Sequence, residues 1–186
     1  DAWPQFEENL EKHHGTWLTN YVGLKNVLLY DGATMRREDV RWNLPEPWIF
    51  WQERMNRRQA DRGHFLLMAS GLLMLMAAGA GLRWRRDQAA VLGVVVAFAT
   101  VVLTCYYWVM LLLVPLGRGR WLPTAGWLAL NTALYALHRI TPAFEMIYGL
   151  MSWALLAFFI AWLAPDAFRT VRQLIGRPQD SAGLEV

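Results

Sequence analysis

Long uncharged stretches in the second part of the chain are the feature that most limits how it can fold. Residues 64–82 are 19 residues without a charge, or about 28 Å of α-helix, which is close to the hydrocarbon thickness of a bilayer. Three further apolar stretches follow at residues 89–116, 121–137 and 141–163. The strands of a membrane β-barrel are about ten residues long with alternating polarity, so these stretches predict helices. The expected fold is an all-α membrane bundle of about four transmembrane helices.

The composition agrees with a location in a membrane. Apolar residues make up 55% of the 186 residues and charged residues only 18%, whereas an average soluble domain is about a quarter charged. The chain has 11 tryptophans, and tryptophan is enriched at the headgroup level of membranes. The net charge of +3 is small, and the basic residues are scattered between apolar stretches. A nucleic-acid surface needs them gathered on one face, so we expect no nucleic-acid partner.

The first part of the chain is predicted to lie at the membrane surface. Residues 1–63 are mixed and polar, which suits an extramembrane or interfacial segment with amphipathic helices. Pro45 and Pro47 precede an aromatic group and then alternating charges, a pattern typical of a helix in the headgroup zone. Residues 64–164 then form the predicted transmembrane region.

The last part of the chain is predicted to leave the bilayer at Pro165, because proline interrupts a helix. Residues 165–180 carry apolar and basic side chains at helical spacing, which predicts an amphipathic surface helix. Residues 181–186 resemble the remnant of a linker and tag. The sequence begins at Asp1 without a signal-peptide pattern, so we expect that something upstream of it was removed or is absent.

Three polar residues inside the predicted membrane region are candidate site residues. Asn131 lies in the third apolar stretch, Thr104 in the second, and Glu145 in the first turn of the fourth. Glu145 is expected to be a headgroup-level acid that pairs with Arg139 or His138 and is favoured by the helix dipole. The alternative is a carboxylate that faces a cavity, because intramembrane acids are costly and often mark a site. Asn131 is expected to hydrogen-bond across a helix interface, with a ligand contact as the alternative, and Thr104 is placed in the same polar patch.

Near the start of the chain, Glu7, Glu11 and His14 fall on one face of a predicted helix. Glu11 and His14 have the spacing of half a carboxylate-bridged metal site, but a dinuclear site needs a second such motif, which the sequence lacks. We therefore predict a polar surface and no metal. The sequence also lacks a glycine-rich phosphate loop, a nucleophile elbow and paired cysteine ligands. Motifs therefore name no enzyme class, and no cofactor is predicted.

Two segments resemble parts of a known class of membrane enzymes. The first is the aromatic-led stretch from Trp3 to His14, followed by Leu18-Thr19-Asn20-Tyr21-Val22-Gly23-Leu24. The second is Leu103-Thr104-Cys105-Tyr106-Tyr107. Together they are similar to the C-terminal region of large bacterial polytopic glycosyltransferases of the C class, which use polyprenyl-phosphate sugars, or of their uncharacterised relatives. The resemblance covers a minor part of the chain.

The resemblance implies an integral protein of the bacterial inner membrane that belongs to a lipid-linked sugar transferase. The residues that it implies for lipid or sugar contact are His14, Asn20, Tyr21, Arg54, Arg57 and Arg58. The first three would line the entrance for the donor or acceptor, and the arginines would meet a lipid phosphate, because guanidinium groups match phosphate oxygens. No residue matches the acidic base of the class, so no catalytic residue is assigned.

Two other interpretations stay open. One is a non-catalytic accessory or scaffold subunit of a membrane complex, whose small-residue helix faces pack against neighbours. The other is a small channel or transporter component, which would need a polar line across the bilayer. The expected partners are membrane lipids, together with upstream helices of the same protein or other membrane subunits.

Overall fold

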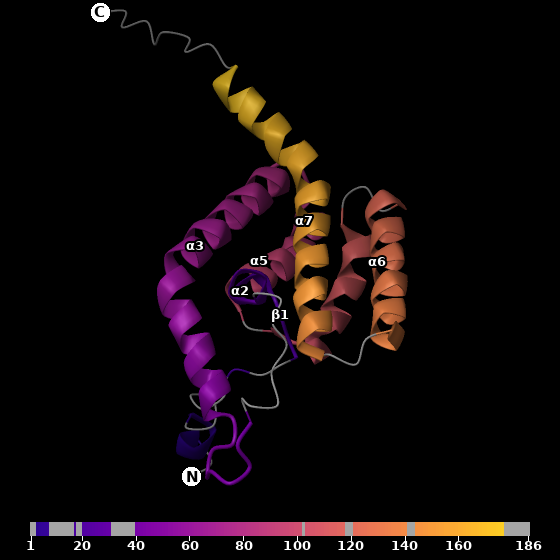
Figure 1. The fold of residues 1–186 in the computed structure, drawn as a ribbon. Coiled ribbons are helices and arrows are strands. Elements are labelled where there is room, and N and C mark those ends of the chain that lie inside the picture. Colours follow the sequence, from indigo (N-terminus) through magenta and orange to yellow (C-terminus); the bar gives the residue numbers. More distant parts are fainter. Residues whose placement is uncertain are drawn as a thin grey trace, which may run out of the picture.

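The computed structural model describes residues 3–7, 17, 20–30, 40–101, 103–117, 121–140 and 144–176. Most of them are helical, which agrees with the predicted all-α class, and Figure 1 shows how the elements are arranged. Residues 3–7 are helical, and the elements that follow are β1 (Tyr21–Val22), α2 (Leu24–Leu29), α3 (Ile49–Gly81), α4 (Arg86–Ala89), η2 (Ala90–Leu92), α5 (Gly93–Thr100), β2 (Leu103–Thr104), η3 (Cys105–Leu116), α6 (Trp121–Ile140) and α7 (Phe144–Ile175), where η marks a 3-10 helix.

The helix α3 joins a charged segment and an apolar segment into one element. It begins at Ile49, directly after Pro47 and Trp48, and continues without interruption to Gly81. The start agrees with the helix predicted after the two prolines. The helix continues through Gly63 into the apolar stretch, and Figure 1 shows that it changes direction in its middle part. A single glycine costs a helix about 1 kcal/mol relative to alanine, which is too little to end it.

The second predicted transmembrane stretch, residues 89–116, is not one helix. The elements α4, η2 and α5 run as far as Thr100, and η3 then folds back against η2 and α5. Between them lies β2, which pairs antiparallel with β1, so that Tyr21 is opposite Thr104. Residues 100–104 are mostly valine and threonine. Branching at Cβ lowers helix propensity and favours the extended backbone, which is why the chain turns here.

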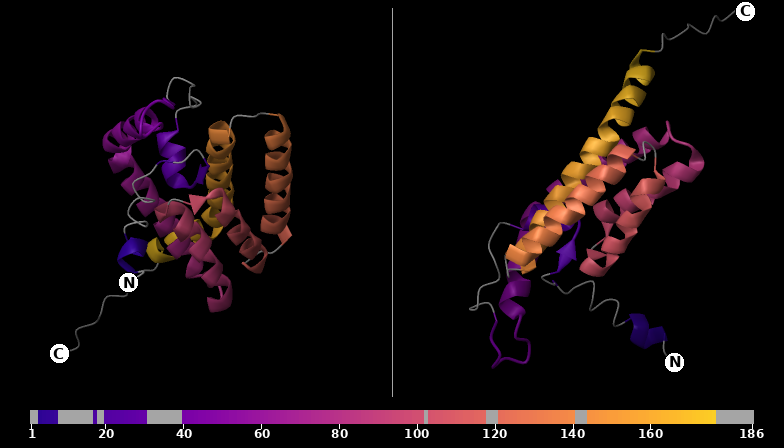
Figure 2. Two further views of the ribbon diagram at one scale, coloured as in Figure 1. Left: turned by 90° about the horizontal axis from the view of Figure 1, so that it is seen from below. Right: turned by 90° about the vertical axis from the view of Figure 1, so that its right-hand side faces the viewer.

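The helices α6 and α7 pack side by side in opposite directions (Figures 1 and 2). Glu145 lies in the first turn of α7, as the sequence predicts. Pro165 lies inside α7 and does not end it, because the helix continues to Ile175. The predicted stop at this residue is therefore wrong. Proline removes one backbone hydrogen bond and bends a helix where packing holds the two halves together, and α7 changes direction in its later part (Figure 1).

Two helices in the described part of the chain are long and apolar enough to cross a membrane. They are α3 (Ile49–Gly81) and Glu145–Ile175 of α7. The prediction of four transmembrane helices is corrected to two for two reasons. The stretch 89–116 is divided between short elements, and α6, although 20 residues long, contains Pro123, Asn131 and His138, which lower its mean hydropathy.

The segment formed by β1 and α2 lies among the larger helices (Figure 1). It contacts α3, α5 and α7, and Leu24, Val27 and Leu29 are at most 2% exposed. Gly23, between the two elements, has a φ of 149°. A Cβ at Gly23 would lie 3.3 Å from the carbonyl oxygens of Phe98 and Val101, so this close approach and this backbone conformation both require glycine.

Hydrogen bonds fix this buried segment at both of its ends. The backbone N–H of Gly23 donates to Oγ of the fully buried Ser152 on α7 at 3.2 Å. At the other end, Nη1 of Arg62 donates to the carbonyl oxygen of Leu28 at 2.9 Å. Nη1 of Arg58 donates to that of Leu29 at 3.3 Å. The last carbonyls of a helix lack partners within the helix, so two α3 arginines supply them.

Candidate functional site

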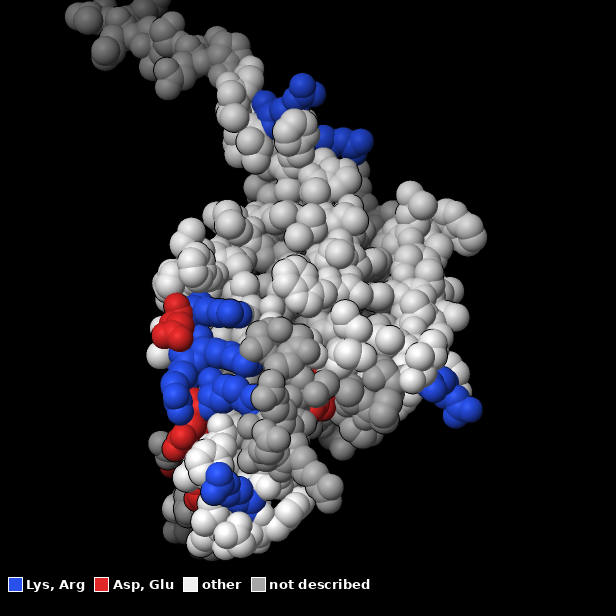
Figure 3. Space-filling view, in the orientation of Figure 1, with Lys and Arg blue, Asp and Glu red and all other residues white. Residues whose placement is uncertain are grey.

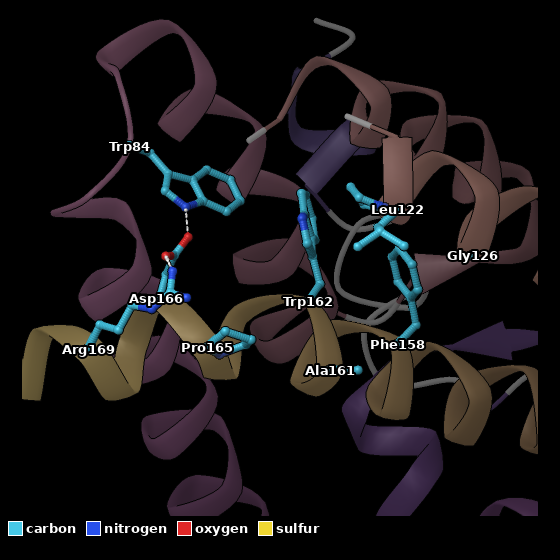
Figure 4. A pocket seen from close by; sticks show the side chains of 10 residues that line it. Trp84, Leu122, Gly126, Phe158, Ala161, Trp162, Pro165, Asp166 and Arg169 are labelled. Atoms are coloured by element: carbon cyan, nitrogen blue, oxygen red, sulfur yellow. Dashed lines mark hydrogen bonds and ion pairs between the residues drawn. The ribbon is translucent and has the colours of Figure 1, made fainter. Parts of the chain in front are cut away.

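A cavity of about 470 Å³ lies between the beginning of α6 and the later part of α7. Figure 4 shows it from close by. The side supplied by α6 consists of Leu122, Pro123 and Gly126. Ligand cavities in proteins commonly measure about 300–1,000 Å³, so the space is large enough for a small molecule or part of a larger one.

The wall supplied by α7 follows from helical spacing. Phe158, Trp162 and Asp166 are four residues apart, so their side chains share one face of the helix. A second row with the same spacing completes this wall and consists of Ala161, Pro165 and Arg169. One end of the wall is therefore aromatic and the other is charged.

Asp166 is the centre of the polar end. Its Oδ2 accepts a hydrogen bond of 2.8 Å from Nε1 of Trp84, which directly follows the last turn of α3. Its Oδ1 lies 3.7 Å from Nε of Arg83 and 3.6 Å from Nη1 of Arg169. Asp166 is buried, and a buried carboxylate is tolerated where opposite charges and hydrogen-bond donors compensate its desolvation.

The two arginines beside Asp166 differ in the exposure of their side chains and in their other hydrogen bonds. Nη1 of Arg83 donates to Oε1 of Gln173 at 2.7 Å, and the side chain of Arg83 is 23% exposed. The side chain of Arg169 is 63% exposed and borders the cavity. Arg83 therefore holds α3 against α7, whereas Arg169 can also meet a molecule that enters the cavity.

A further ion pair lies at the start of α4. Nε of Arg85 lies 3.2 Å from Oδ1 of Asp87. Slight desolvation raises the pKa of Asp87, but the charge and hydrogen bond of Arg85 and the backbone N–H groups of Asp87 and Gln88 outweigh it and hold the pKa below its usual value. Asp87 is therefore ionised at neutral pH and offsets the charge of Arg85.

Aromatic contacts make the cavity wall stiff. The ring centroids of Trp84 and Trp162 are 5.2 Å apart, and those of Trp162 and Phe158 are 5.9 Å apart. Gly117, at the end of η3, lies so close to Trp162 that a Cβ there would be 2.6 Å from the ring. Such packing leaves the Trp162 ring little freedom to move into the cavity.

A smaller cavity of about 290 Å³ lies at the other end of the α6–α7 pair. Its polar side chains are Asn131, Tyr135, His138 and Tyr148. Asn131 was predicted to bond across a helix interface, and its Nδ2 donates to the carbonyl oxygen of Trp127 on its own helix at 2.9 Å. The structure thus places Asn131 at a cavity, but with a bond to its own helix.

The other predicted site residues fall in three different places. Tyr21 and Thr104 are paired by the β1–β2 ladder, and Asn20 lies in the turn just before it. Glu145 is half-buried at the start of α7. His14 lies outside the described residues.

The three arginines predicted to meet a lipid phosphate all lie on α3. Nη1 of Arg58 is bonded to the carbonyl oxygen of Leu29. Arg57 is exposed and lies 3.6 Å from Oε2 of Glu53. The guanidinium carbon of Arg54 is 5.3 Å from the centroid of the Trp51 ring. These arginines form a face with mixed partners and do not border either of the two cavities.

Asp166, Trp84 and Arg169 are not among the residues predicted from the sequence. A signal existed, because Asp166 is an acid at the end of an apolar stretch and Trp84 lies among arginines at the end of another. No local feature of the sequence brings these two ends together, since residues 84 and 166 are separated by 82 positions.

The lining of the larger cavity is mostly apolar, with one charged pair. Of its lining residues only Asp166 and Arg169 ionise, and they are paired with each other. Within the described ranges no group of three or more histidine, cysteine or acidic side chains could hold a metal ion. The cavity offers aromatic and aliphatic walls next to a charged rim, which suits a molecule with an apolar body and a polar end.

Comparison of the chain with protein-family models, with curated proteins and with solved structures found no match.

Proposed function

We propose that the chain is a membrane-embedded helical unit that binds a membrane lipid in the cavity between α6 and α7. The apolar body of the lipid lies against Phe158 and Trp162, and its headgroup lies near Asp166 and Arg169. The cavity, with its apolar walls and charged rim, is the observation that carries this proposal.

The exposure of the apolar helices supports a membrane. In the most apolar 18-residue stretch of α3, only 17% is buried within the chain. The corresponding stretch of α7 is 39% buried. The core helix of a soluble protein would be mostly buried. Leu67, Leu72 and Leu75 on α3 are 64–76% exposed, and soluble monomers rarely expose large continuous apolar surfaces.

The levels at which the charges lie give further support. Figure 3 shows a broad uncharged belt between the charged first half of α3 and the arginines near the end of α7. Arg83 and Asp166, which follow the apolar segments of α3 and α7, contact one another. Both segments therefore end at the same level, as they would at one boundary of a bilayer.

The experiment that tests this proposal fills the cavity. Ala161→Phe places a ring among the lining residues, and Ala157→Phe, one turn earlier on an exposed position outside the cavity, is the matched control. The purified chain is delipidated in detergent, and binding of added phospholipid is measured by native mass spectrometry. Ala161→Phe should weaken binding roughly tenfold, as expected if two CH₂ groups lose their contacts.

Ala157→Phe should bind lipid like the wild type. Equal binding by all three proteins, each with an unchanged thermal unfolding temperature, would show that the cavity is not the lipid site.

One observation favours the transferase as a more specific form of this function. The two segments that resemble C-class glycosyltransferases are far apart in the sequence, yet Tyr21 and Thr104 are paired in the β1–β2 ladder. A shared entrance for a lipid-linked sugar would need these segments to be adjacent. A transfer assay with polyprenyl-phosphate sugars is the direct test of this role.

A further inference from the structure

Positive charge exceeds negative charge at the polar end of the α6–α7 cavity. Residues 83–87 and 166–172 contain five arginines and two aspartates. Asp87 is paired with Arg85, and Asp166 is shared between Arg83 and Arg169. At the cavity itself, the single carboxylate of Asp166 faces the guanidinium groups of both Arg83 and Arg169, so a net positive charge stays at its polar end.

Arg169 is the cation that an incoming headgroup meets. It borders the cavity and is largely exposed, whereas Arg83 is mostly buried and already donates to Gln173. Arg172, one turn further, has its guanidinium carbon 5.3 Å from the ring centroid of Phe168 and does not line the cavity. Asp166, 3.6 Å from Nη1 of Arg169, holds that guanidinium at the rim.

The same cavity has features that suit the opposite headgroup charge. Trp84 and Trp162 form an aromatic pair, and aromatic faces attract quaternary ammonium groups such as choline. A choline group beside Asp166 would, however, lie next to the guanidinium groups of Arg83 and Arg169. The carboxylate that would favour it is already engaged by Trp84 and these two arginines, so the balance of charge favours an anion.

We propose that the lipid in this cavity is an anionic phospholipid, whose phosphate is bound by Arg169. This inference rests on the proposed lipid site and adds its headgroup selectivity. Basic pockets between transmembrane helices are a known means of binding anionic headgroups, and the planar guanidinium group matches two phosphate oxygens.

The test compares phosphatidylglycerol with phosphatidylcholine of identical acyl chains. The wild-type chain in detergent is expected to prefer phosphatidylglycerol by about fivefold, the effect of roughly one arginine near a membrane surface. Arg169→Gln should weaken phosphatidylglycerol binding more than phosphatidylcholine binding and so remove this preference, because the choline of phosphatidylcholine already offsets the charge of its phosphate. Arg172→Gln should keep the preference, because its side chain does not reach the cavity. Higher salt should reduce the preference, because Arg169 is exposed to solvent.

Other outcomes identify which idea fails. Wild-type binding that is equal for both lipids, but lost in Ala161→Phe, would overturn the headgroup inference and leave the lipid site standing. If the wild-type chain bound phosphatidylcholine more tightly than phosphatidylglycerol, the headgroup would lie against the Trp84–Trp162 pair, and the inference of an anionic lipid would be overturned. Displacement of phosphatidylglycerol by inorganic phosphate alone would indicate a free-anion site and overturn the assignment to a lipid. If Ala161→Phe did not weaken the binding of either lipid, the cavity would not be the lipid site.

Discussion

Ser152 has a hydroxyl group that serves two elements at once. It donates to the carbonyl oxygen of Tyr148 at 2.7 Å and accepts from the backbone N–H of Gly23 at 3.2 Å. Nδ2 of Asn26 lies 3.4 Å from the same oxygen. Because Ser152 is fully buried, water cannot replace it as the partner of the Gly23 N–H, and an unpaired buried N–H is costly.

Ser152→Ala is therefore expected to lower the free energy of unfolding by about 1–3 kcal/mol. The matched control is Thr132→Ala, which removes a hydroxyl that bonds only the carbonyl of Leu128 on its own helix and is exposed. That change should cost less than about 0.5 kcal/mol. Thermal unfolding in one detergent measures both. Equal losses in the two variants would mean that the Gly23 bond contributes little.

At the level of elements, α2 is held by cations from another helix. It has six residues, too few to be stable alone in water. The carbonyls at its end are bonded by Arg58 and Arg62 of α3, and positive groups are favoured at the negative end of a helix. Both arginines therefore have a structural use that does not require a lipid phosphate.

Replacing both arginines should loosen α2 without unfolding α3. Arg58→Met with Arg62→Met keeps the apolar stems but removes the donors, so amide hydrogen exchange across residues 24–30 should become roughly tenfold faster. Arg57→Met is the control, because Arg57 is exposed and its ion pair is with Glu53 on the same helix. Such exposed pairs contribute little. Faster exchange in the control alone would contradict the capping role.

The elements also show which features of the fold the sequence could predict. Local signals succeed: the prolines before Trp48 mark the start of α3, and Glu145 falls in the first turn of α7. The fold-back near residues 100–104 was not predicted, because an uncharged run of 28 residues contains no polar break. The valines and threonines there favour an extended backbone, and Tyr21 and Val22 supply the strand with which it pairs.

Site residues were harder to predict than helices, for a similar reason. A polar residue inside an apolar stretch, such as Asn131, can be recognised from its neighbours in the sequence. Asp166 gains its surroundings from Trp84 and Arg83, which lie 82 and 83 positions away. Its role depends on α3 and α7 ending at the same level, and no local pattern encodes that level.

For the whole molecule, the path of the chain makes a topological prediction. The starts of α3 and α7 and the end of α6 lie at one end, and the ends of α3 and α7 and the start of α6 at the other (Figure 1). In a membrane, α6 must therefore cross back between α3 and α7, although it has no stretch as apolar as theirs. Arg57 and Arg139 should then lie on one side, and Arg86 and Arg172 on the other. If each of the four apolar stretches crossed the membrane once, as the sequence predicts, Arg57 and Arg172 would instead lie on the same side.

Single-cysteine variants distinguish these arrangements. In a Cys105→Ser background, Arg57→Cys and Arg139→Cys should react with an impermeant maleimide from one face of sealed vesicles. Arg86→Cys and Arg172→Cys should react only from the other face. Labelling of positions 57 and 172 from the same face would refute the fold-back at β2 within the membrane.

The bond between Gly23 and Ser152 joins residues 129 positions apart, which has a consequence for the order of events during synthesis. A ribosome adds about 5–20 residues per second, so on the order of ten seconds separate the appearance of the two partners. During that interval the apolar residues of α2 have no α7 to cover them. The segment that ends up inside the bundle must therefore remain exposed, or bound by a chaperone, until α7 is made and encloses it.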